Sequence, residues 1–144
     1  MESYARISAD GQYRYVLGRR WADGPIARFV MLNPSTADGS QDDPTIRRCM
    51  GFAKSWDLSG IQVLNLYALR ATQPAALWLA DDPVGPDNDA YLVLATESHE
   101  DGVIVAAWGA NAKPDRVARV MELLQGQHVQ CLGITKAGQP KHPL

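Results

Sequence analysis

Residues 29–38 read Phe-Val-Met-Leu-Asn-Pro-Ser-Thr-Ala-Asp, an apolar run that stops at Asn33 and Pro34. Proline has no N–H and fixes φ, so a strand is expected to end there. The residues from Ser35 to Asp43 are mostly small, polar or acidic, and a helical pattern follows them. A buried strand that leads through a polar loop into a helix is the usual place for a ligand in an open α/β sheet.

Three further apolar runs, at residues 61–67, 103–108 and 128–133, are separated from one another and from residues 27–33 by helical patterns. Their hydrophobicity is continuous rather than alternating, which is typical of strands buried on both faces of a parallel sheet. The sequence therefore predicts an α/β fold, a three-layer α/β/α sandwich around a central four-stranded parallel sheet.

An antiparallel hairpin is predicted at the N-terminus, where residues 4–7 and 13–17 flank the turn signal Asp10-Gly11. Residues 1–22 would then be an extension of a single domain whose α/β core is residues 27–144. Asp43 and Pro44 predict the N-cap and first position of a helix. Helices are predicted over residues 45–56, 75–80, 87–99 and 113–125.

The composition favours an ordinary cytoplasmic protein without a metal or a cofactor. No apolar segment is long enough to span a membrane, and the N-terminus lacks the features of a secretion signal. Cys49 and Cys131 fit reduced thiols, and a metal site built on these two cysteines is not expected. The net charge of −2 lacks the basic excess usual in proteins that grip a nucleic-acid duplex.

Polar side chains follow each predicted strand, and the carboxyl ends of parallel strands meet at one edge of a sheet. Amide and hydroxyl groups gathered there suit a ligand with paired donors and acceptors, such as a nucleobase edge. The candidate binding residues are Asn33, Pro34, Ser35, Thr36, Asn65, Tyr67, Arg70, Trp108, Asn111, Lys136 and His142.

Several of these candidates have a structural alternative. Asn33 and Pro34 form a strand-end turn in the plainer interpretation, Asn65 caps a loop, and Trp108 is a core residue. Arg47 and Arg48 lie in the first turn of a helix, where an anion is favoured, and are predicted either to bind phosphate or to form a solvated face.

The chain closely resembles an uncharacterised bacterial and phage domain-of-unknown-function family, which brings no established activity with it. The resemblance covers nearly the whole chain. It is carried by the segments at residues 31–38, 43–48, 65–72, 82–89, 107–109 and 138–144, the first of which reads Met-Leu-Asn-Pro-Ser-Thr-Ala-Asp.

A more distant resemblance is to the uracil-DNA glycosylase superfamily. The order of Leu32-Asn33-Pro34, Asn65, the segment Trp108-Gly109 and Lys141-His142-Pro143 is similar to the order of its motifs. The resemblance implies a glycosylase-like fold in which Asn33 positions the attacking water. It also implies that Asn65 reads the base and that His142 stabilises the leaving base as a neutral donor.

The chain departs from the glycosylase pattern at Met31-Leu32, which replace a glycine, and at Leu144, which replaces a serine. No counterpart of the loop that wedges into a duplex follows. The sequence predicts a nucleobase, nucleotide or nucleic-acid ligand, with N-glycosidic hydrolysis catalysed by Asn33 and His142. The alternatives are a binding module for a nucleotide or modified base without turnover, and a protein-interaction domain.

Overall fold

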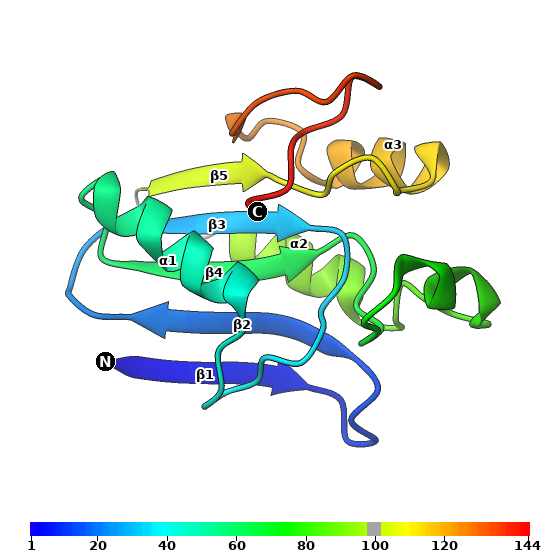
Figure 1. The fold of residues 1–144 in the computed structure, drawn as a ribbon, viewed down its shortest axis with the longest axis horizontal. Coiled ribbons are helices and arrows are strands. Elements are labelled where there is room, and N and C mark those ends of the chain that lie inside the picture. The colour runs from blue at the N-terminus through cyan, green and yellow to red at the C-terminus, as the bar shows by residue number, and fades with distance from the viewer. Residues whose placement is uncertain (98–101) are drawn as a thin grey trace.

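A computed structural model describes residues 1–97 and 102–144 and shows a six-stranded sheet with helices on both of its faces (Figure 1). The elements in chain order are β1 (Glu2–Ile7), β2 (Arg14–Arg20), β3 (Ile26–Met31), α1 (Pro44–Ser55), β4 (Gly60–Asn65), the 3₁₀ helix η1 (Pro74–Leu79), α2 (Asn88–Thr96), β5 (Gly102–Ala106), α3 (Pro114–Leu123) and β6 (Val129–Cys131).

The sheet is mixed, with strand order β1-β2-β4-β3-β5-β6. Parallel pairing joins β4 to β3, β3 to β5 and β5 to β6. Antiparallel pairing joins β1 to β2 and β2 to β4. The α/β class predicted from the sequence is confirmed. The N-terminal hairpin of β1 and β2, however, is part of the same sheet as the four parallel strands, because β2 pairs with β4. Six of the seven residues of β2 are buried, so this strand belongs inside the sheet.

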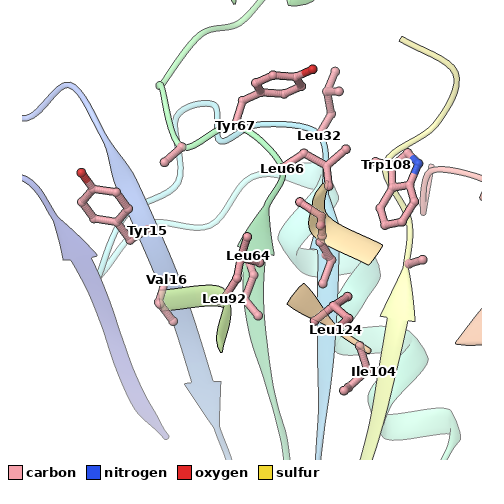
Figure 2. Packing of buried hydrophobic residues seen from close by; sticks show 14 of the residues in the cluster. Tyr15, Val16, Leu32, Leu64, Leu66, Tyr67, Leu92, Ile104, Trp108 and Leu124 are labelled. Carbon is pink, nitrogen blue, oxygen red and sulfur yellow. The ribbon is translucent and has the colours of Figure 1, made fainter. Parts of the chain in front are cut away.

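Alternate residues of β3 serve two hydrophobic cores, one on each face of the sheet. Phe29 and Met31 pack with Ile46, Cys49 and other residues of α1 on one face. Val30 belongs to the opposite cluster, which contains residues of α2 and α3. Figure 2 shows part of that second cluster, with Leu92 and Leu124 among residues from the strands. Burial on both faces explains the continuous hydrophobicity of β3.

The helix predicted after Asp43 is confirmed, because the Asp43 side chain accepts a hydrogen bond from Ile46 N–H at 2.9 Å and Pro44 begins α1. The short helical pattern at residues 75–80 is a 3₁₀ helix. The predicted end of the third helix, near His99, lies outside the described residues. The prediction that the last strand is buried on both faces is wrong, because β6 is three residues long and largely exposed at the sheet edge.

The fold brings the first turn of α1 and the C-terminal segment to the edge of the sheet where β3 and β5 end (Figure 1). The C-terminal segment is fixed to the end of β5 by a hydrogen bond from Gly109 N–H to the Pro140 carbonyl at 2.9 Å. Among the described residues no helix is long and apolar enough to cross a membrane.

Candidate functional site

A cavity of about 600 Å³ opens at the carboxyl ends of β3 and β5. Five residues predicted from the sequence as site residues share it, namely Asn33, Ser35, Trp108, Asn111 and His142. The complete lining comprises Arg14, residues 31–33, Ser35, Asp43, residues 45–46, residues 71–72, Pro74, residues 108–111, Thr135, residues 141–142 and Leu144. The volume falls in the range of small-molecule sites, which is about 300–1,000 Å³.

The side chain of Asn33 is held in one orientation by two backbone carbonyls. Its Nδ2 donates to the Ala71 carbonyl at 2.8 Å and to the Pro34 carbonyl at 3.0 Å. These two acceptors settle which end of the amide is the nitrogen. The Oδ1 atom accepts no hydrogen bond from the described part of the protein, so it is available to a ligand or a water.

His142 is positioned by the way the C-terminal segment is fixed to the end of β5. Trp108 Nε1 donates to Gln139 Oε1 at 3.0 Å, beside the Gly109–Pro140 backbone hydrogen bond. Gly109 adopts a φ of +75°, which favours glycine and turns the chain directly after Trp108. Trp108 itself is buried in the core cluster and is therefore both a core residue and a wall of the cavity.

The imidazole of His142 is set up as a neutral hydrogen-bond donor. Its Nδ1 accepts from the Leu144 N–H at 3.2 Å, which places the proton of the neutral ring on Nε2. Burial lowers the pKa of His142 below its ordinary value, against an opposing attraction from the Asp43 carboxylate. At neutral pH His142 is therefore uncharged.

Asp43 brings a carboxylate to the same cavity. Its Oδ1 caps α1 by accepting from Ile46 N–H, and within residues 1–97 and 102–144 no donor occupies its Oδ2. From the sequence, Asp43 was predicted to cap the helix, and its carboxylate was not among the predicted catalytic residues. A carboxylate is a far better proton acceptor than an amide, so Asp43 is a stronger base than Asn33.

Arg14 is the most unusual residue of the cavity, because its buried cation forms no ion pair with any residue of the ranges 1–97 and 102–144. It is 2% exposed, its Nη1 donates to the Ala37 carbonyl at 2.9 Å, and its Nε has no partner in the described part of the chain. Desolvation lowers the pKa of Arg14 to about 10. The group remains a cation at neutral pH.

The sequence analysis missed Arg14, Thr45, Thr135 and Lys141 as cavity residues. One signal for Arg14 was present: it is the only charged residue in Tyr13-Arg-Tyr-Val-Leu17, which is otherwise apolar or aromatic. Such a residue in a buried strand needs a partner. Thr45 and Thr135 carried no comparable signal, because a hydroxyl at a helix start or in a loop is ordinary.

The structure does not bring Asn65 to the cavity, although the sequence placed it in the base-reading role. Asn65 is completely buried at the end of β4, and its Oδ1 and Nδ2 have no hydrogen-bond partner among the described residues. Its backbone carbonyl accepts from Asn88 Nδ2 at 3.0 Å.

The remaining predicted site residues also lie outside the cavity lining. Tyr67 accepts a hydrogen bond from Lys113 N–H at 3.1 Å, and Arg48 donates to the Pro143 carbonyl at 3.2 Å. Arg48 thus fixes the segment that carries His142. The others are Pro34, which is buried, Arg70, which is half-buried, and Thr36, Arg47 and Lys136, which are exposed.

No group of three or more His, Cys, Asp or Glu side chains within the described ranges is arranged to hold a metal ion. The cavity instead offers an amide, a neutral imidazole, a carboxylate, a guanidinium and several hydroxyls.

Comparison with known proteins gives one match. The sequence model of a family described as "Protein of unknown function (DUF1643)" matches residues 14–144, a range that begins at the first residue of β2 and includes the whole cavity lining. No curated protein and no solved structure matches the chain. The resemblance to uracil-DNA glycosylases is therefore not supported by these comparisons.

Proposed function

Because the chain belongs to the DUF1643 family, whose description names no activity, we propose a function from the cavity alone: it binds a nucleobase-containing small molecule and hydrolyses its N-glycosidic bond. The observation that carries the proposal is the meeting of Asn33, Asn111 and His142 in one cavity with the Asp43 carboxylate. Amides and a neutral imidazole complement the donors and acceptors of a base edge.

Water activation falls to Asn33 and Asp43. The amide of Asn33 is held rigidly and presents Oδ1 as an acceptor that orients a water molecule. Asp43 accepts the proton as the water oxygen bonds to the anomeric carbon and the carbon–nitrogen bond breaks. The same carboxylate stabilises the positive charge that develops on the sugar ring.

His142 acts on the leaving base. Its Nε2–H donates a hydrogen bond to the base as the electrons of the broken bond move onto it. A neutral donor suits this task because burial keeps the imidazole uncharged. We assign base recognition, which was predicted for Asn65, to Asn111, because this exposed residue lines the cavity and Asn65 does not.

The test is release of free base from a panel of nucleosides, nucleotides and uracil- or hypoxanthine-containing DNA, followed by chromatography. Asp43→Asn is the informative variant, because asparagine still caps α1 while losing its basicity. The proposal expects release from at least one substrate class and a loss of about 100-fold or more in this variant. Thr36→Ala, at an exposed position outside the cavity, is the matched control and should keep full activity.

A second candidate function is ligand binding without turnover. It is favoured by the position of Asn65, which is completely buried and lies outside the cavity lining. Thermal stabilisation by a nucleoside or nucleotide without base release would support this alternative. If no compound of the panel stabilises the protein and none releases a base, both functions are refuted.

A further inference from the structure

Two arginines on β2 are buried to the same extent and have opposite surroundings. Arg14 and Arg19 are each 2% exposed. Arg19 forms an ion pair with Asp42 at 2.9 Å and donates to backbone carbonyls that include those of Gly18 and Asp38. Arg14 donates to the Ala37 carbonyl and forms no ion pair with a described residue, although Asp43 and Asp38 attract it from a greater distance.

A buried charge without a partner destabilises a fold, so its presence requires an explanation. The Asp43 carboxylate lines the same cavity as Arg14, but it caps α1 instead of pairing with the guanidinium. Within the described residues the Arg14 guanidinium makes one hydrogen bond, so most of its five N–H donors have no acceptor in the protein, and Arg14 lines the cavity.

The surroundings of Arg14 add further features that suit an anion. Thr45 and Ile46, in the first turn of the twelve-residue helix α1, line the cavity, and a helix N-terminus favours negative charge. Thr45, Thr135 and Lys141, which carry two hydroxyl groups and an ammonium group, are also lining residues of the cavity. The first turn of α1 is not sufficient evidence for an anion site. The buried guanidinium of Arg14, whose Nε has no partner among the described residues, is a second and separate reason to expect an anion here.

We infer that Arg14, with Lys141 and the start of α1, forms an anion subsite that holds the phosphate of a nucleoside monophosphate. The nucleoside part of this ligand rests on the proposed function, whereas the anion subsite is inferred from the surroundings of Arg14. A planar guanidinium can donate two parallel hydrogen bonds to phosphate oxygens. The preferred ligand is then a free nucleotide, and the subsite lies at Arg14 instead of at the predicted Arg47 and Arg48.

The experiment is a thermal-shift and calorimetric titration of the full chain in phosphate-free buffer. The probes are adenosine, guanosine, cytidine and uridine, their 5′-monophosphates, ribose 5-phosphate and inorganic phosphate. Each is measured on wild type, Arg14→Met and Lys141→Met. Lys136→Met is the matched control, because Lys136 lies in the same C-terminal segment but outside the cavity lining. Far-UV circular dichroism checks that each variant is folded.

The expected result is that at least one monophosphate binds about 10- to 100-fold more tightly than its nucleoside. Arg14→Met should abolish that difference, Lys141→Met should reduce it, and Lys136→Met should preserve it. If Arg14→Met fails to fold, the affinities of Lys141→Met and Lys136→Met for the monophosphate still test the subsite, because only the first variant should lose affinity.

Equal binding of nucleoside and monophosphate would overturn the anion subsite and leave the proposed function standing. Binding of ribose 5-phosphate or inorganic phosphate as tightly as any nucleotide would support the subsite and refute the nucleobase part. A preference for monophosphate that survives Arg14→Met and Lys141→Met would overturn the assignment to these residues.

Discussion

Replacing Arg14 by methionine should leave the protein as stable as wild type or make it more stable, although the side chain is almost fully buried. Burial lowers the pKa of Arg14 from 12.5 to about 10. At about 1.4 kcal/mol per unit, the cation costs the unliganded fold about 3 kcal/mol. Because the pKa is lower in the folded chain, this cost is fully present below pH 10 and fades only as the pH rises further.

Methionine removes that cost and retains much of the apolar volume. It also removes the hydrogen bond to the Ala37 carbonyl, which costs about 1–3 kcal/mol if the carbonyl stays buried without a partner. The net expectation is a change in the free energy of unfolding between about zero and 2 kcal/mol in favour of the variant.

Arg19→Met is the matched comparison. It leaves Asp42 and several backbone carbonyls without their donor, and we expect it to destabilise the protein by about 3–5 kcal/mol. The assay is chemical denaturation in phosphate-free buffer near pH 7, with unchanged m values as the condition for comparison. A loss of 3 kcal/mol or more in Arg14→Met, similar to that of Arg19→Met, would show that Arg14 is satisfied within the protein and would refute the reasoning.

Three further outcomes are expected. Asn88→Ala removes two buried hydrogen bonds to the carbonyls at the end of β4 and should cost about 2–3 kcal/mol in chemical denaturation, whereas a loss below 0.5 kcal/mol would contradict their importance. A thiol reagent near pH 8 should label the exposed Cys131 in the native protein and Cys49 only after unfolding, because burial raises the pKa of Cys49 to about 12; rapid double labelling of the native protein would contradict this. Burial lowers the pKa of His142, so the free energy of unfolding should fall as the pH drops below about 6.5. The variant His142→Gln should reduce the slope of the free energy of unfolding against pH. An unchanged slope would show that other groups cause the pH dependence.

The central part of the sheet was predictable because β3, β4 and most of β5 are buried and their apolar runs are continuous, whereas β6 is largely exposed. The hairpin was harder, since β2 contains Arg14 and Arg19 and so resembles a half-exposed strand. Its two buried arginines lie in polar surroundings formed by the loop after β3, which no local pattern reveals. The pairing of β2 with β4 is also a contact between distant parts of the chain, and no local sequence pattern reveals it.

The site was predictable where it follows from the topology. Asn33, Asn111 and His142 were expected to lie together because parallel strands end at one edge of a sheet, and they line one cavity. Asn65, the last residue of β4, is completely buried and lies outside that lining. The position of Asp43 directly before Pro44 predicted that one of its oxygens caps α1. That position does not reveal that the second oxygen, Oδ2, accepts no hydrogen bond from the described residues.

The most direct test of the proposed cavity function is a crystal structure of the protein soaked with the nucleoside monophosphate that stabilises it most. The predicted result is a base beside Asn33, Asn111 and His142, with its phosphate on the guanidinium of Arg14. A nucleotide bound elsewhere on the protein, or a phosphate seated away from Arg14 in this cavity, would contradict it.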